Sequence, residues 1–165
     1  MQNDFITGAL GTAEAQAIVP RAAEKVKQFT GKVLFTRDTH GKDYLQTREG
    51  QHLPVEHCIH GTSGWEICPE LQPLCKKPPI DKPAFGSAEL GALLAKENER
   101  DTIRSITLIG LCTDICVISN ALLLKAFLPE AEIIVDAACC AGVSPESHQT
   151  ALRAMQACQI QIENP

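Results

Sequence analysis

Apolar residues recur along this chain in two patterns: short continuous runs, which predict buried strands, and spaced stripes, which predict helices with one buried face. The second half shows both patterns in regular alternation. It predicts strands over 106–110, 132–136 and 159–162, and helices over 115–127 and 145–158. Ser144 and Pro145 mark a helix start, because serine caps the first turn and proline suits the first helical position.

The first half is less regular, and polar loops separate its predicted elements. Pro20 suits the first turn of a helix, and Ser87 suits the cap of another. In chain order we expect turns and loops over 1–17, a helix over 20–29, a strand over 32–36, a polar loop over 41–63, a short helical turn within 65–77, a strand over 79–81 and a helix over 88–98.

Strands that alternate with helices are typical of βαβ units. We therefore predict an α/β fold with a mostly parallel, doubly wound, Rossmann-like sheet and helices on both of its faces. No internal repeat or linker interrupts the chain, so we expect a single domain over residues 1–165. Ligands of such sheets bind at the carboxyl ends of the strands. Asp38, His40, Lys82 and Cys116 all follow predicted strands.

The formal net charge of the chain is −5, and no dense cluster of Lys and Arg is present. This charge pattern argues against nucleic acid and anionic membranes as partners. No apolar run reaches the roughly 18 residues of a membrane span without a polar break. The eight cysteines follow no leader-like segment and lack C-x-x-C spacing. We therefore expect reduced thiols in the cytoplasm rather than disulfides or a cysteine-rich zinc site.

Cys116 lies in the first turn of the predicted helix over 115–127. There, the unpaired backbone N–H groups and the positive end of the helix dipole favour a thiolate over a thiol. A thiolate beyond the carboxyl end of a strand is a candidate nucleophile. The alternative is that Cys116 is a small buried hydrophobic residue, as most free cysteines are.

Asp38 and His40 point to the same side of an extended segment, because side chains alternate along a strand. With Glu49 and His57 from the following loop they form a set of two histidines and two carboxylates. That set suits a divalent metal, Zn²⁺, Fe²⁺ or Mn²⁺, with water in the open positions. The alternative is that these are solvated residues of a polar loop.

Lys82 stands between Asp81 and a proline, just before a Gly-Ser turn. An ammonium group near a thiol helps to hold it ionised and can stabilise negative charge on a substrate. The alternative is a surface lysine paired with Asp81.

Several short motifs together carry a family resemblance. They are MQNDF at 1–5, TRDTH at 36–40, HCIHGTSGWEI at 57–67, DKPAFGS at 81–87 and GLCTDICV at 110–117. In this order, and over nearly the whole chain, they resemble the isochorismatase-like cysteine hydrolases, the superfamily of nicotinamidases and related amidases.

The resemblance implies roles for the residues around the candidate nucleophile. Cys116 matches the family nucleophile, and Lys82 matches the lysine of its catalytic triad. The bond between Leu111 and Cys112 falls where the family has a non-proline cis peptide, so the N–H groups of Cys112 and Cys116 would form an oxyanion hole. The implied reaction is amide hydrolysis through a thioester.

The resemblance also implies a metal site and a small-molecule amide substrate. The metal ligands would be Asp38, His40, His57 and, as in some members, Glu49. The metal would bind the pyridine nitrogen of the substrate and orient its ring. Phe5 and Phe85 fall where family members pack aromatic side chains against that ring, and core packing is the alternative for both. Members are often homo-oligomers.

Two departures from the family pattern qualify this picture. In the family, the aspartate of the catalytic triad ends a central strand, directly before the segment that matches residues 1–5 of this chain. We expect that this strand and its aspartate precede the chain, so that the domain over 1–165 is truncated at its N-terminus by about one strand. In addition, residues 53–56 (LPVE) lack the aromatic residue that many nicotinamidases have just before the metal histidine. That absence weakens the case for nicotinamide but leaves the amidase chemistry untouched.

The leading hypothesis is a cytoplasmic cysteine amidase that converts nicotinamide to nicotinate and ammonia. Hydrolysis of a ureido or carbamoyl amide is an alternative, and isochorismate hydrolysis is disfavoured because cleaving a vinyl ether needs no thiol. A catalytically impaired binding protein is a further alternative, since the triad aspartate is absent from residues 1–165. A thiol redox protein built on Cys112 and Cys116 is another.

Overall fold

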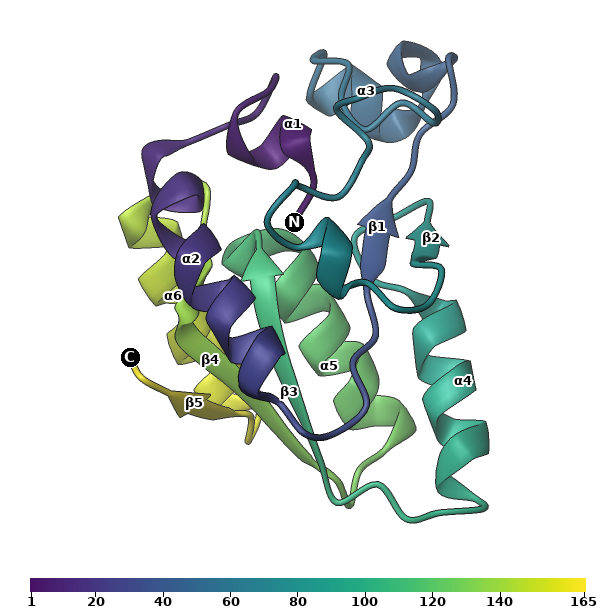
Figure 1. Ribbon diagram of the computed structural model, residues 1–165, viewed down its shortest axis with the longest axis vertical. Helices are drawn as coiled ribbons and strands as arrows, with labels where there is room; N and C mark the ends of the chain where they lie inside the picture. The colour runs from purple at the N-terminus through teal and green to yellow at the C-terminus, as the bar shows by residue number, and fades with distance from the viewer. The chain divides into compact units, whose positions relative to one another are not determined.

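Parallel strands joined by helices build both halves of the chain. The computed structural model describes residues 1–165, which divide into two compact units, Met1–Ala84 and Phe85–Pro165 (Figure 1). The first unit contains a two-stranded sheet and the second a three-stranded sheet, and every strand pair is parallel. The predicted α/β class with parallel strands is therefore confirmed.

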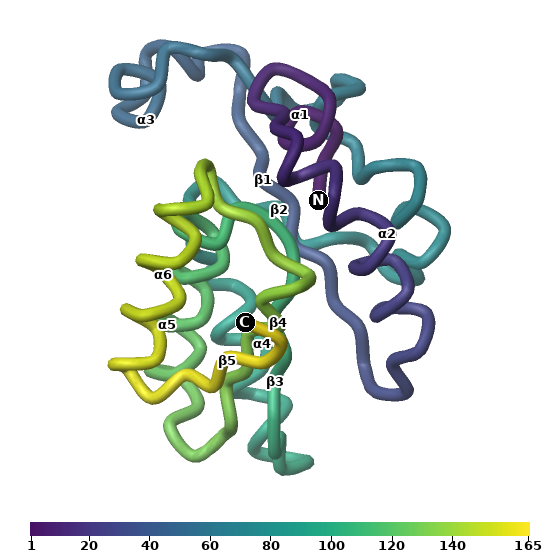
Figure 2. The backbone as a smooth tube through the Cα atoms, turned by 90° about the vertical axis from the view of Figure 1, so that its left-hand side faces the viewer, coloured from purple at the N-terminus to yellow at the C-terminus, as the bar shows by residue number.

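The second unit follows the predicted alternation closely. Its elements are α4 (Ala88–Asn98), β3 (Ser105–Leu111), the π-helical turn η3 (Thr113–Val117), α5 (Ile118–Phe127), β4 (Glu132–Ala141), α6 (Pro145–Ala157) and β5 (Gln161–Glu163). The strand order is β3-β4-β5. Helices α5 and α6 lie next to each other and contact the sheet through β4 (Figure 2). The core includes Leu124, Ile133, Val135 and Met155, all almost fully buried.

Local signals account for the helix starts in the second unit. The Ser87 hydroxyl accepts a hydrogen bond from the N–H of Leu90, and the Ser144 hydroxyl accepts one from Ser147. Each bond satisfies an N–H group that the first helical turn leaves without a partner. Both predicted caps are confirmed. Strand β4 extends past the predicted end at 136, because the apolar run continues to Ala141 and pairs with β3 there.

The first unit departs further from the sequence pattern. Its elements are α1 (Asn3–Ile6), α2 (Ala13–Gln28), β1 (Thr36–Asp38), the 3₁₀ turn η1 (Tyr44–Gln46), α3 (Arg48–His52), the 3₁₀ turn η2 (Gln72–Leu74) and β2 (Ile80–Lys82). Short elements and connecting loops make up most of this unit, and the β1–β2 pair is its only named sheet.

The predicted start of the first long helix at Pro20 is wrong. Helix α2 begins at Ala13, where the Thr12 hydroxyl accepts a hydrogen bond from the N–H of Ala15, and Pro20 lies inside the helix. Proline inside a helix removes one backbone hydrogen bond. The burial of Ile18, Val19 and other apolar residues on one helix face offsets that loss.

The predicted strand over 32–36 is also wrong in its position. Strand β1 runs from Thr36 to Asp38, because its partner β2 offers three residues in register, from Ile80 to Lys82. Asp38 is therefore the last residue of the strand rather than part of the segment that follows it. None of the helices combines the length and the apolar composition that crossing a membrane requires.

Candidate functional site

The parallel register of β1 and β2 places Asp38 beside Lys82. Lys82 Nζ donates to Asp38 Oδ1 at 3.2 Å and to the carbonyl of Ala84 at 3.1 Å. Both Asp38 and Lys82 are 3% exposed. The alternative of a surface lysine paired with Asp81 is wrong, since Asp81 instead accepts from Arg37 Nε at 2.7 Å.

Four side chains gather on the other side of the Asp38 carboxylate. One ligand atom from each lies within 4.8 Å of all the others, and the four residues are Asp38, His40, Glu49 and His57. His40 Nε2 is 3.4 Å from Asp38 Oδ2 and 3.5 Å from Glu49 Oε1. His57 Nε2 is 3.9 Å and 3.7 Å from the same two oxygens. The structure thus brings together all four residues that the sequence suggested as metal ligands.

The geometry and the protonation of this cluster fit a divalent metal. Bonds of about 2.0–2.1 Å to Zn²⁺ would set neighbouring ligands of a tetrahedron about 3.3–3.4 Å apart. The four nitrogen–oxygen separations, 3.4–3.9 Å, are at or slightly above that spacing. His40 Nε2 is buried and makes no hydrogen bond. His57 Nδ1 donates to the carbonyl of Val55 at 2.8 Å, so in the neutral ring Nε2 carries the lone pair toward the cluster.

Charge pairing within the cluster shifts two pKa values. Burial alone would raise the pKa of Asp38, but the neighbouring His40 and the Lys82 ammonium outweigh burial and hold that pKa below its ordinary value. The Asp38 carboxylate raises the pKa of His40 against the opposing effect of burial, and Glu49 adds to the increase. A proton and a metal ion compete for His40, so metal affinity should rise with pH.

The turn that carries Glu49 is fixed by local hydrogen bonds. The Thr47 hydroxyl accepts from the N–H of Gly50 at 3.0 Å and caps α3, which puts Glu49 in the first helical turn. A side chain at Gly50 would collide with the backbone carbonyl of Tyr44. The polar loop predicted over 41–63 therefore contains ordered helical turns that present a ligand.

Sequence reasoning missed Tyr44, which packs against both histidines of the cluster. Its ring centroid lies 4.7 Å from that of His40 and 5.0 Å from that of His57, and the residue is fully buried. Its hydroxyl donates to the carbonyl of Leu53 at 2.9 Å. The available signal was that the only tyrosine of the chain stands in a mostly polar loop, between the segments of the two histidines. Phe5, a predicted substrate contact, meets the His57 ring edge-on, with 5.6 Å between the ring centroids.

Cys116 belongs to the second unit, in the π-helical turn η3 between β3 and α5. It is 9% exposed, and none of the eight cysteines forms a disulfide. The peptide bond between Leu111 and Cys112 is cis, as the resemblance implied. The oxyanion hole of Cys112 and Cys116 stays a prediction, and so does the joint role of Cys116 with Lys82 of the first unit.

Asn120, which sequence reasoning also missed, ties the turn of Cys116 to the start of α4. Its Nδ2 donates to the carbonyl of Cys116 at 2.7 Å and to that of Phe85 at 3.1 Å. Its Oδ1 accepts from the N–H of Ser87 at 2.9 Å. Phe85 itself is 43% exposed, so core packing does not explain its side chain.

The model of the isochorismatase domain family matches residues 1–163 of the chain. The chain belongs to this family. No curated protein matches the sequence.

Solved structures that this chain resembles include proteins named as nicotinamidases and pyrazinamidases. A nicotinamidase of Bacillus subtilis is 29% identical with a TM-score of 0.80, covering 99% of this chain and 94% of its own. A pyrazinamidase/nicotinamidase of Streptococcus mutans is 27% identical with a TM-score of 0.81, covering 98% and 94%. A pyrazinamidase of Pyrococcus horikoshii, solved in complex with zinc, is 26% identical with a TM-score of 0.79, covering 98% and 93%.

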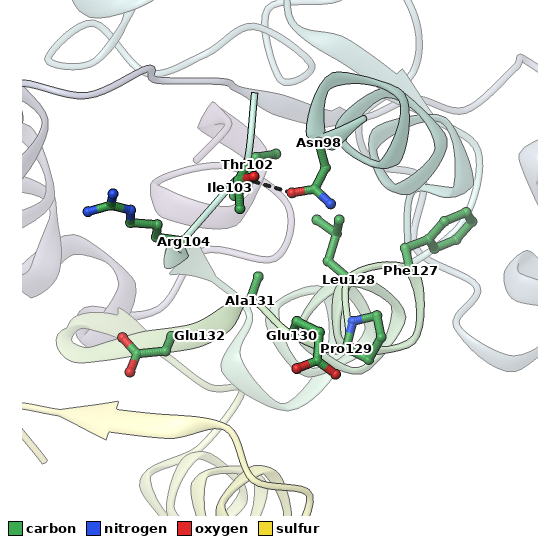
Figure 3. A pocket seen from close by; sticks show the side chains of 10 residues that line it. All are labelled: Asn98, Thr102, Ile103, Arg104, Phe127, Leu128, Pro129, Glu130, Ala131 and Glu132. Carbon is green, nitrogen blue, oxygen red and sulfur yellow. Dashed lines mark hydrogen bonds between the residues drawn. The ribbon is translucent and has the colours of Figure 1, made fainter. Parts of the chain in front are cut away.

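One cavity of this isochorismatase-family chain is lined by none of the candidate site residues. It measures about 500 Å³ in the second unit (Figure 3). Its lining residues are Asn98, Thr102, Ile103, Arg104, Phe127, Leu128, Pro129, Glu130, Ala131 and Glu132. They surround the amino ends of β3 and β4, whereas Cys116 follows the carboxyl end of β3. Because ligands of parallel sheets bind at the carboxyl ends, this cavity is not the candidate site.

Proposed function

We propose that the chain is a cysteine-dependent amidase that hydrolyses a small amide, with nicotinamide as the first candidate. Membership of the isochorismatase domain family and solved neighbours that are nicotinamidases and pyrazinamidases support the reaction class. The observation that carries the proposal is the convergence of Asp38, His40, Glu49 and His57 within 4.8 Å, with Lys82 on the opposite oxygen of Asp38.

In the proposed reaction, the Cys116 thiolate attacks the amide carbon and forms a tetrahedral oxyanion. The N–H groups of Cys112 and Cys116 donate to that oxyanion. Its collapse breaks the carbon–nitrogen bond, releases ammonia and leaves a thioester on Cys116. Water then hydrolyses the thioester to the carboxylate product. The departing nitrogen takes up a proton and leaves as ammonia.

Asp38, His40, Glu49 and His57 would hold a divalent metal, and Zn²⁺, Fe²⁺ and Mn²⁺ all suit this ligand set. When bound, the metal would supply a Lewis acid that takes the ring nitrogen of the substrate. Lys82, buried against Asp38, would keep that carboxylate ionised and turned toward the two histidines.

A ureido or carbamoyl amide is the second candidate substrate. It is favoured by the segment over 53–56, which has no aromatic side chain to stack on a pyridine ring. A substrate without a ring would not need that contact.

Ammonia release from a panel of nicotinamide, pyrazinamide and a carbamoyl amide, with and without Zn²⁺, tests the proposal. We expect turnover of at least one amide, and loss of that turnover in Cys116→Ala. Cys158→Ala is the matched control, because Cys158 is an exposed thiol outside the site.

Other outcomes identify the alternatives. Binding of an amide by wild type without turnover would favour a binding protein. A reversible Cys112–Cys116 disulfide without any hydrolysis would favour a redox protein.

A further inference from the structure

Gln2, at the start of the chain, binds the backbone of a residue of the metal cluster without adding an atom to the cluster itself. Gln2 is 2% exposed, and its side-chain amide lies along the backbone of Asp38. Gln2 Nε2 donates to the carbonyl of Asp38 at 2.8 Å, and Gln2 Oε1 accepts from the N–H of Asp38 at 2.7 Å. The amide therefore makes the two backbone hydrogen bonds with Asp38 that a residue of a neighbouring strand would make. Gln2 Nε2 also donates to the carbonyl of Trp65 at 2.9 Å.

Asp4 makes the corresponding contact with the second ligand segment. Its Oδ2 accepts from the N–H of Cys58, directly after His57, at 2.7 Å. Cys58 is fully buried and has a φ of 47°, a left-handed conformation that non-glycine residues rarely adopt. The carbonyl of Cys58 accepts from the N–H of His40 at 3.0 Å. Asp4 thus stabilises a turn that joins two of the ligand residues.

The segment that carries these two side chains is itself anchored by its backbone. The N–H of Asn3 donates to Glu66, that of Asp4 donates to Gly64, and the carbonyl of Met1 accepts from Cys68, each at 3.0 Å. These bonds fix residues 1–4 against 64–68. Gln2 and Asp4 therefore project from a rigid base toward two segments that are distant from it in sequence.

We propose that Gln2 and Asp4 are positioning residues of the metal centre: Gln2 holds the backbone of Asp38, and Asp4 holds the turn after His57. This inference rests on the metal centre of the proposed function. Neither side chain contributes an atom to the cluster. Outer partners that orient ligands typically change metal affinity by about 10- to 100-fold when they are removed.

Zinc affinity, measured by competition with a chromophoric chelator, tests the inference. Gln2→Met keeps the length of the side chain but removes its three hydrogen bonds, and Asp4→Ala removes the acceptor for Cys58. We expect each to raise the Kd for Zn²⁺ by about 10- to 100-fold. Asp4→Asn keeps an oxygen that can accept from Cys58, so its Kd should lie close to that of wild type.

Asn3→Ala is the matched control. Asn3 belongs to the same segment, but its Nδ2 donates to the carbonyl of Ser63, at 2.7 Å, which lies outside the ligand segments. Its Kd for Zn²⁺ should not change. The visible absorption of bound Co²⁺ gives a second readout, because it reports the geometry of the ligands. The spectrum should change in Gln2→Met and Asp4→Ala and stay constant in Asn3→Ala.

The outcomes separate this inference from the metal centre on which it rests. Wild type that binds no Zn²⁺ would overturn both. Wild type that binds Zn²⁺, with unchanged Kd and Co²⁺ spectrum in Gln2→Met and Asp4→Ala, would overturn the positioning role alone. An equal loss in Asn3→Ala would also overturn it, because general loosening of the segment would then explain the effect. Should Gln2→Met fail to fold, the Asp4→Ala and Asp4→Asn pair decides.

Discussion

The two units of this protein present their chemistry in different ways. In the second unit, Cys116 sits in the turn between a regular strand and a regular helix, and Asn120, one helical turn later, binds its carbonyl. In the first unit, the four donors come from β1, from α3 and from irregular chain, and side chains such as Gln2 and Tyr44 take the place of regular structure around them. A nucleophile needs one turn with a defined backbone, whereas a metal site needs several segments to converge.

Cys116→Ala distinguishes most directly the chemistry of the second unit from metal binding in the first. We expect it to lower kcat for amide hydrolysis by roughly 10⁴-fold or more, because no other group replaces the nucleophile. Zinc binding by the first unit should stay intact. Ammonia release and zinc stoichiometry on the same sample measure both effects. Substantial turnover by the variant would contradict the role of Cys116.

The next largest effect compares two adjacent ion pairs across β1 and β2. Lys82→Met leaves the buried Asp38 carboxylate without that cation and should cost about 3–5 kcal/mol of unfolding free energy. Asp81→Asn breaks the neighbouring pair with Arg37 at its exposed end, since the Asp81 side chain is 40% exposed, and should cost about 0–1 kcal/mol. Urea unfolding of both variants without metal measures the difference. Equal costs would mean that burial does not distinguish the two pairs.

Metal addition tests whether the cluster of Asp38, His40, Glu49 and His57 in the first unit binds a metal ion. At a free Zn²⁺ concentration about 100 times the Kd, wild type should gain about 2.7 kcal/mol of stability, and a chelator should reverse the gain. His40→Ala should show a much smaller gain. Thermal unfolding with and without Zn²⁺ measures this. A gain in His40→Ala equal to that of wild type would place the ion elsewhere.

The smallest expected effect belongs to the second unit. His148 is hydrogen-bonded to the buried Thr113 of η3 at 2.8 Å, and burial lowers the pKa of His148 below its ordinary value, with Asp114 opposing. As pH decreases, the imidazole of His148 is therefore protonated in the unfolded chain at a higher pH than in the folded chain. The free energy of unfolding should fall as pH decreases from about 6.5 through the lowered pKa.

The slope from this histidine cannot exceed about 1.4 kcal/mol per pH unit, the value for one proton. His148→Gln should remove that part of the slope. Urea unfolding of both proteins between about pH 5 and 7.5 measures it. An identical pH dependence in the two proteins would show that His148 does not titrate in this range.

Sequence reasoning recovered the candidate metal ligands and the cis peptide bond. The set of Asp38, His40, Glu49 and His57 followed from their residue types, and the structure brings these four side chains together. Their role as metal ligands stays a prediction. The cis bond between Leu111 and Cys112, which the resemblance implied, is present in the structure. The pairing of Lys82 with Asp38 rather than with Asp81 did not follow from the sequence. It depends on the register of two three-residue strands, which no local pattern encodes.

The sequence by itself determined where helices α4 and α6 begin, at Ala88 and Pro145, and that β3 is a strand. Helix caps and apolar runs act within a few residues, so a local pattern is enough to predict them. Only the tertiary structure decided that α2 passes through Pro20, since burial of one helix face outweighs a lost backbone hydrogen bond. It also decided that Gln2 binds the backbone of Asp38, 36 residues away. Such contacts form when distant segments pack together, and packing is a property of the whole fold rather than of any stretch of sequence.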